Sequence, residues 1–223
     1  MSAPKNILIA GSSGMVGSHL LQICLDSNEV NKIILLSRKP SLIKDSKIEE
    51  IIVEDFINFT APHFKQIDVV FFCIGIYTGA ADKNTFKKIT VDYPVALAKA
   101  VYAHSPSSKF ILLSGARADR SEKSWVTFEK LKGMAENKLY EIYSNNFHSA
   151  RPSYIYPVIK RKEPNLMYKF SRFFYPLIKL LGEKFSITSI QVAKALFVLG
   201  MKQHEQTSFE NKELIVLNRK NSL

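Results

Sequence analysis

The stretch NILIAGSSGMVG, which runs from Asn6 to Gly17, decides the fold. Its first five residues are an apolar run that stops at Gly11, a pattern typical of a short buried strand. Residues 18–26 continue with the apolar spacing of a helix. Between them, Gly11, Gly14 and Gly17 have the GxxGxxG spacing that allows a sharp turn, close approach of a pyrophosphate and tight packing of helix on strand.

This strand–loop–helix unit predicts a dinucleotide-binding site. The free N–H groups and the positive end of the helix favour phosphates. A purely structural turn is the alternative, but the motif has the context that it requires, a strand–helix junction followed by further strands and helices. The loop residues expected to contact the cofactor are Gly11, Ser13, Gly14, Met15, Val16 and Gly17.

Strands and helices alternate along most of the chain. Further strands are expected at residues 32–37, 50–55, 68–75, 109–115 and 148–156, and helices at 85–104 and 124–143. Continuous apolar strands indicate burial on both faces, hence a parallel sheet between layers of helices. The prediction is an α/β fold with a doubly wound parallel sheet of the Rossmann type.

The end of the second predicted strand bears on which dinucleotide binds. An Asp or Glu about 20 residues after the loop would bind the ribose hydroxyl of NAD, but Ser37, Arg38 and Lys39 stand there instead. A hydroxyl and two cations suit a 2′-phosphate, so NADP(H) is expected in preference to NAD(H). The alternative is that Arg38 stacks on the adenine or faces solvent.

Length and composition exclude several classes of protein. At 223 residues, 46% hydrophobic and 23% charged, the chain has the composition of one globular domain. It contains no apolar run long enough to span a membrane and no signal-peptide pattern. Its two cysteines form no CxxC pair and its five histidines lack metal-ligand spacing. No metal is therefore expected, and a reducing cytoplasm is the expected compartment.

The C-terminal part departs from the alternating pattern. A helix is expected at 189–202 and a last strand at 213–217. Residues 1–223 are predicted to form a single NAD(P)-binding Rossmann-type domain, in which 157–212 make up most of a small substrate or lid lobe.

Positive charge is concentrated at this end: of a net +11, residues 151–223 hold 13 basic against 5 acidic side chains. Residues 160–184 combine seven cations with several aromatic side chains. A lid helix with solvated lysines is the favoured interpretation. The alternatives are a pocket for an anionic small-molecule substrate, peripheral contact with anionic lipid, and nucleic-acid binding. Membrane contact is disfavoured, and no nucleic acid is expected because no recognised nucleic-acid-binding motif is present.

Several segments together resemble a known family. They are GSSGMVG at 11–17, VEDF at 53–56, FFCIG at 71–75, VDYPVALAKA at 91–100, LLSGARADRS at 112–121 and ARPS at 150–153. In order and spacing they resemble the atypical short-chain dehydrogenases, and among these the NAD(P)-binding oxidoreductases similar to the HIV Tat-interactive protein 2. The resemblance implies that Asp55 hydrogen-bonds the adenine amino group, with Phe56 beside it. It also implies that Gly75 passes close to the cofactor and that Arg151 and Pro152 lie near the nicotinamide.

The same resemblance implies the catalytic residues. Ser114 matches the family's serine, which hydrogen-bonds the substrate carbonyl, and Lys132 matches its lysine, which holds the nicotinamide ribose. The family's tyrosine acid stands four residues before that lysine, one turn away on the same helix face. Phe128 occupies this position here and has no proton to give. Aligning Lys130 in place of Lys132 puts Val126 there, which is no better.

Phe128 leaves several interpretations open, of which the plainest is a core residue on its helix. A first alternative is that another group serves as the acid, such as Ser114, a water held by Lys132 or a tyrosine from elsewhere. A second is that the reaction needs no proton from the protein, and a third is that the protein binds NADP(H) and reduces nothing. The candidate tyrosines are Tyr77, Tyr154 and Tyr156. The sequence predicts an NADP(H)-dependent oxidoreductase acting on a small carbonyl or hydroxyl compound. The alternative is a catalytically weak NADP(H)-binding redox sensor or protein-interaction module with a protein partner.

Overall fold

A seven-stranded parallel sheet forms the centre of the computed structural model, which describes residues 3–57, 64–77, 79–159 and 185–220. The strands are β1 (Lys5–Ala10), β2 (Val30–Ser37), β3 (Ile48–Ile52), β4 (Val69–Phe72), β5 (Lys109–Leu113), β6 (Phe147–Arg151) and β9 (Ser208–Glu210). Their order is β3-β2-β1-β4-β5-β6-β9, and every neighbouring pair is parallel. All but the last strand follow the order of doubly wound dinucleotide-binding sheets, which confirms the predicted fold class.

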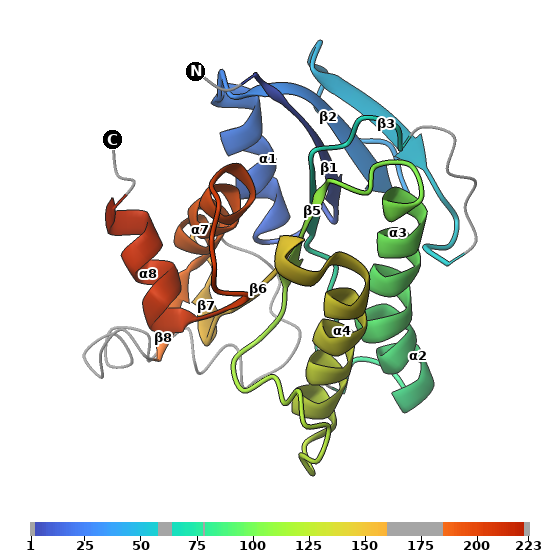
Figure 1. Ribbon diagram of the computed structural model, residues 1–223, viewed down its shortest axis with the longest axis vertical. Helices are drawn as coiled ribbons and strands as arrows, with labels where there is room; N and C mark the ends of the chain where they lie inside the picture. Colours follow the sequence, from blue (N-terminus) through green and yellow to red (C-terminus); the bar gives the residue numbers. More distant parts are fainter. Residues whose placement is uncertain (1–2, 58–63, 78, 160–184, 221–223) are drawn as a thin grey trace.

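Helices cover both faces of this sheet (Figure 1). On one face lie α1 (Gly17–Asp26), α7 (Ser189–Met201) and α8 (Asn211–Lys220), and on the other α2 (Lys83–Lys87), α3 (Tyr93–Tyr102) and α4 (Thr127–Tyr143), which the short turn η2 (Ser144–Asn146) follows. Successive residues of β1 serve the two layers alternately. Ile7 and Ile9 belong to the core beneath α1 and α7, whereas Leu8 and Ala10 belong to the core beneath α3 and α4. This burial on both faces explains the unbroken apolar strands.

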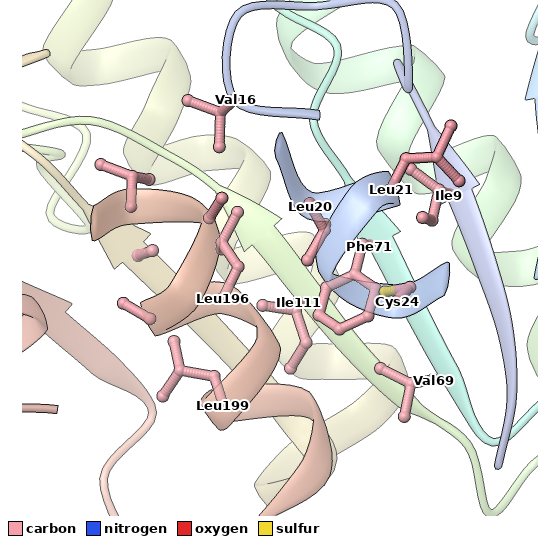
Figure 2. Packing of buried hydrophobic residues seen from close by; sticks show 14 of the residues in the cluster. Ile9, Val16, Leu20, Leu21, Cys24, Val69, Phe71, Ile111, Leu196 and Leu199 are labelled. Atoms are coloured by element: carbon pink, nitrogen blue, oxygen red, sulfur yellow. The ribbon is translucent and has the colours of Figure 1, made fainter. Parts of the chain in front are cut away.

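Figure 2 shows the first of these cores, where Leu20 and Cys24 of α1 and Leu196 of α7 gather around Phe71 of β4. The close approach of α7 depends on Gly200, because a Cβ there would lie 2.5 Å from Phe71 Cζ. Glycine at position 200 therefore allows α7 to pack closely against the central strands.

Three predicted elements differ from the structure. The predicted helix at 85–104 is interrupted by a π-helical turn, η1 (Lys88–Asp92), between α2 and α3. The predicted strand at 213–217 is wrong, because these residues lie within α8, where Leu214 and Ile215 are buried. A short apolar run does not by itself separate a buried strand from a buried helical turn. The last strand, β9, precedes it.

The predicted strand at 148–156 is two strands in the structure. β6 ends at Arg151 and Pro152 follows it, because proline has no N–H to donate to the ladder. The second piece, β7 (Tyr154–Tyr156), pairs in parallel with β8 (Ser186–Thr188) in a separate two-stranded sheet.

The span 157–212, predicted to make up most of a small lobe, is described in part. Residues 160–184, and with them the interpretations of the basic aromatic segment, lie outside the described residues. Within the same span, α7 packs on the main sheet and β9 extends it. In the part of the chain that the structure describes, no helix has both the length and the apolar character needed to cross a membrane.

Candidate functional site

The glycine loop lies where the strand order reverses. β1 sits between β2 and β4, and a crevice forms at the carboxyl ends of such a pair of strands. Gly11 follows β1 with φ +93°, and a Cβ on it would lie 2.9 Å from the backbone of Cys73 and Ile74 beyond β4. A Cβ on Gly17 would lie 2.1 Å from the carbonyl oxygen of Gly11. Both glycines are therefore needed for the loop to turn and for α1 to begin where it does.

The rest of the loop borders a cavity. The N–H of Gly14 donates to the carbonyl of Gly11 at 3.0 Å, and Gly14, Met15 and Val16 line the cavity. Val16 is the N-cap residue of α1 and makes no side-chain capping hydrogen bond. The N–H of Ser18 in the first turn of α1 donates to the carbonyl of Gly14 at 3.0 Å, and the positive end of the helix points toward the loop, which suits an anionic group. Ser13 is exposed.

The cavity, of about 540 Å³, opens at the carboxyl ends of β1, β4, β5 and β6. The sequence-predicted site residues that it brings together are Gly14, Met15, Val16, Gly75, Ser114, Phe128, Lys132 and Pro152. A Cβ on Gly75 would meet nothing within 4 Å, so the backbone there borders open space. Segments from both halves of the chain therefore contribute to a single site.

The other predicted residues lie outside this lining; they are Gly11, Ser13, Gly17, Ser37, Arg38, Lys39, Asp55, Phe56 and Arg151. Ser37 ends β2, and its Oγ donates to the carbonyl of Lys39 at 2.7 Å. Arg38 and Lys39 are exposed. Their side chains are thus available to a ligand that extends beyond the end of β2.

Asp55 is held by a lysine that no sequence pattern singled out. Lys88 of η1 donates from Nζ to Asp55 Oδ2 at 2.7 Å. This hydrogen bond lowers the pKa of the Asp55 carboxyl and raises the pKa of Lys88. Phe56 is buried, with its ring centre 5.4 Å from that of Tyr93. The predicted adenine end of the site is therefore tied to the helical segment after β4. Lys88 follows Lys87 directly, and nothing in the sequence distinguishes the two.

Ser114 is hydrogen-bonded to a buried carboxylate. Its Oγ donates to Glu136 Oε1 at 2.7 Å, and Glu136 is 0% exposed. Arg151 donates from Nε to the same oxygen at 3.0 Å and from Nη2 to Oε2. The guanidinium also reaches the exposed Glu210 at 3.0 Å. Sequence reasoning missed Glu136, although its place one turn after Lys132 on the same face of α4 was a usable signal.

Lys132 enters the site from α4 with a buried side chain. Its Nζ donates to the carbonyl of Leu113 at 3.2 Å and lies 6.0 Å from the centre of the Phe128 ring. Burial lowers the pKa of Lys132 to about 8, against the opposing attraction of Glu136. The alternative lysine, Lys130, is exposed and does not line the cavity.

Phe128 is both a residue of the site and a residue of the core. It lines the cavity one helical turn before Lys132, and it also packs against the core beneath α3 and α4. Of the tyrosines considered as substitute acids, Tyr77 and Tyr154 line the cavity, whereas Tyr156 does not. The arrangement therefore places an aromatic ring without a hydroxyl beside a serine and a lysine.

Comparison with known proteins agrees with the fold. The model of the NAD dependent epimerase/dehydratase family matches residues 7–126. Protein HTATIP2 of Rattus norvegicus is 24% identical over 221 residues, covering 96% of this chain and 90% of its own length. This relationship confirms the predicted resemblance to the atypical short-chain dehydrogenases.

Solved structures show the same fold at low identity. WbmF of Bordetella bronchiseptica, in complex with NAD+, is 14% identical with a TM-score of 0.67, over 99% of this chain and 80% of that one. Gre2 of Candida albicans, in complex with NADPH, is 15% identical with a TM-score of 0.65, over 98% and 83%. Because the family model matches more than half of its residues, the chain belongs to the NAD dependent epimerase/dehydratase family.

Proposed function

We propose that this protein is an NADP(H)-dependent oxidoreductase of the atypical short-chain class that acts on a small carbonyl or hydroxyl compound. The observation that carries the proposal is the meeting of the glycine loop with Ser114 and Lys132 in one cavity at the reversal of strand order. Gly14 and Val16 would face the pyrophosphate, and Lys132 would hold the nicotinamide ribose. A bound nicotinamide supplies or accepts a hydride.

The choice of NADP(H) rests on this chain's own residues, since the compared structures include one with NAD+ and one with NADPH. Arg38 and Lys39 present two exposed cations directly after β2. No carboxylate stands at this point to bind a free ribose hydroxyl or to repel a phosphate. Arginine in particular binds phosphate through two parallel N–H bonds.

The test is a fluorescence titration of the purified protein with NADPH and with NADH. NADPH should bind more tightly, and Arg38→Ala should weaken it about tenfold, the effect of losing a charge-assisted hydrogen bond, while affecting NADH little. Lys65→Ala is the matched control, because it removes an exposed cation from the loop before β4, at the opposite edge of the sheet. Equal affinity for the two nucleotides would contradict the preference, and binding of neither would contradict the cofactor site itself.

A second candidate function is favoured by Phe128. A protein that binds NADP(H) without the usual acid could report the redox state of the nucleotide to a protein partner instead of reducing a substrate. The placement of Phe128 in the cavity lining supports this candidate, since the ring faces the site without a proton to give. Activity of Phe128→Tyr compared with the native chain separates the two functions.

A further inference from the structure

The hydroxyl of Ser114 has its single proton engaged away from the cavity. Ser114 Oγ donates to Glu136 Oε1 at 2.7 Å, and Arg151 binds both oxygens of that carboxylate. A carboxylate bridged by a guanidinium is ionised and can only accept hydrogen bonds. Ser114 therefore presents oxygen lone pairs, and no proton, to whatever occupies the cavity.

This arrangement makes Ser114 a poor proton donor. If its proton moved to a substrate, the remaining alkoxide would lie 2.7 Å from Glu136, which is 0% exposed. Like charges so close in a buried site strongly disfavour ionisation. Turning the hydroxyl toward the cavity would leave Glu136 short of a partner, which is also costly for a buried carboxylate.

Unlike Ser114, Lys132 has protons that it can donate into the cavity. Its ammonium has three N–H bonds, of which the contact with the carbonyl of Leu113 at 3.2 Å uses one. Among the described residues that line the cavity, it is the one with a charged side chain. The lowered pKa, about 8, matches the requirement that a general acid be poised near the working pH.

Other ionisable groups surround Lys132 and must be weighed as donors. They are Glu136 on the same helix, Arg151 of β6 behind it, and Cys73, Tyr77 and Tyr154 in the cavity lining. Burial raises the pKa of the Cys73 thiol to about 12, which makes it a weak acid here. Tyr77 and Tyr154 remain alternative proton donors, so the experiments include a substitution of each.

We propose that Lys132 itself gives the proton to the substrate oxygen, in place of the missing tyrosine, and that Glu136 positions Ser114 as a hydrogen-bond acceptor. The inference rests on the proposed oxidoreductase function. A reduced nicotinamide, when bound, would supply the hydride that the carbonyl carbon receives. As the carbonyl π electrons move to oxygen, one N–H bond of Lys132 breaks and an O–H bond forms. The lysine is left as a neutral amine and regains its proton from water, while Ser114 accepts a hydrogen bond from the new hydroxyl.

The central experiment measures benzaldehyde reduction by NADPH as a function of pH, at saturating NADPH. The native chain should show a rate that is constant at low pH and falls about tenfold per pH unit above the lysine's pKa of about 8. Lys132→Arg keeps the charge and the N–H donors for the ribose but does not release a proton in this range. It should bind NADPH within about threefold of the native affinity and lose about 100-fold or more in rate.

Lys109→Met is the matched control. Lys109 begins β5 at the opposite edge of the sheet, where burial also lowers its pKa to about 8 and its Nζ donates to the carbonyl of Lys202 at 2.6 Å. Its loss should leave the pH profile unchanged. Tyr77→Phe and Tyr154→Phe should keep the fall in rate at the same pH, whatever they do to substrate affinity.

A second readout does not depend on turnover. With isotope-labelled lysine side chains in the cofactor-free protein, the NMR signal that disappears in Lys132→Met should titrate near pH 8. Titration at the ordinary lysine value of about 10.4 would contradict the proposal, as would a Lys132→Arg protein that keeps the native rate, or a Tyr154→Phe or Tyr77→Phe protein that loses the fall in rate.

Failure of the proposed oxidoreductase function can be distinguished from failure of the role given to Lys132. If NADPH binds and Phe128→Tyr reduces benzaldehyde while the native chain does not, Lys132 is not the acid, although the site still binds NADPH. If neither protein reduces benzaldehyde, the oxidoreductase function is contradicted and the role of Lys132 falls with it.

Discussion

The ring of Phe128 occupies the space that a side chain on Gly115 would need: a Cβ on Gly115 would come within 2.5 Å of Phe128 Cζ. The aromatic ring at the tyrosine position is therefore seated on the backbone that follows Ser114. The glycine that follows Ser114, just beyond β5, thus sets the position of the Phe128 ring relative to the Ser114 hydroxyl and Lys132.

Gly115→Ala should push this ring aside. We expect a loss of about 1 kcal/mol in the free energy of unfolding, the lower end of overpacking costs, because the end of a side chain can move. In a Phe128→Leu background the same substitution should cost less, since the contacting atom is gone. Urea denaturation of the four proteins of this double-mutant cycle measures the coupling. An identical cost in both backgrounds would show that the contact does not constrain the site.

Phe128→Tyr should add a second proton donor to the cavity. We expect faster benzaldehyde reduction with NADPH and a fall in rate displaced above the native one, toward the ordinary tyrosine pKa of about 10. Phe128→Leu, which removes the ring without adding a hydroxyl, is the control and should not gain activity. A Phe128→Tyr protein with native rate and native pH profile would mean that the new hydroxyl does not reach the substrate.

Glu136→Gln should be far more costly than Glu210→Gln, although both carboxylates bind Arg151. Glu136 is 0% exposed, and its loss leaves the guanidinium without a buried counter-charge, at a cost of about 3–5 kcal/mol. The Glu210 side chain is 51% exposed, so its pair with Arg151 contributes about 0–1 kcal/mol. Urea denaturation of both variants gives the comparison. Equal losses would argue against Arg151 being held chiefly by Glu136.

Gly17→Ala and Gly75→Ala should separate stability from binding. A Cβ on Gly17 would lie 2.1 Å from a backbone oxygen that cannot move alone, so we expect a thermal unfolding midpoint many degrees lower. A Cβ on Gly75 would meet nothing within 4 Å but would enter the cavity. That variant should keep its stability within about 0.5 kcal/mol and bind NADPH more weakly. Unchanged NADPH affinity would place the nucleotide away from Gly75.

Stability should fall in mild acid because of His148. This side chain is 0% exposed, burial lowers its pKa to about 4 from 6.5, and its Nε2 has no hydrogen-bond partner among the described residues. Since the unfolded chain binds the proton more readily, the free energy of unfolding should decrease as pH falls from 6.5 to about 4, by at most about 1.4 kcal/mol per pH unit from this group. Above pH 6.5 both states are neutral and the contribution is flat.

Urea denaturation across this range tests the effect. His148→Phe should flatten the dependence, and His104→Asn, which alters an exposed histidine, should not. A slope that survives in His148→Phe would assign the acid sensitivity to other groups, of which His204, with a pKa also lowered by burial, is the nearest.

The parts of this protein that were predictable are those whose information is local. The glycine loop after β1 and the apolar strands identify the fold because backbone turns and two-sided burial leave marks on adjacent residues. The segment 213–217 shows the limit of this reasoning, because a short apolar run suits a buried helix as well as a strand.

The polar contacts of the site were not predictable in the same way. Ser114 finds Glu136, and Asp55 finds Lys88, only after strands and helices have packed. The members of each pair are separated by tens of residues in the sequence. Other acids and lysines lie nearby, and no local pattern marks one of them as the partner. The family resemblance identified Ser114 and Lys132, but not the carboxylate that accepts the hydrogen bond of the serine.

The buried pair of Glu136 and Arg151 also bears on the order in which the chain becomes functional. α4 is synthesised before β6, so Glu136 emerges from the ribosome ahead of the arginine that neutralises it. Until β6 joins the sheet, burying this glutamate would leave it without the arginine that pairs with it, which is costly. The burial of Glu136, and with it the orientation of the Ser114 hydroxyl, therefore waits for the sheet to be extended as far as β6. A nascent chain that has made only the glycine loop and the first five strands contains the motif that identifies the fold. It still lacks the Glu136–Arg151 pair that orients the Ser114 hydroxyl.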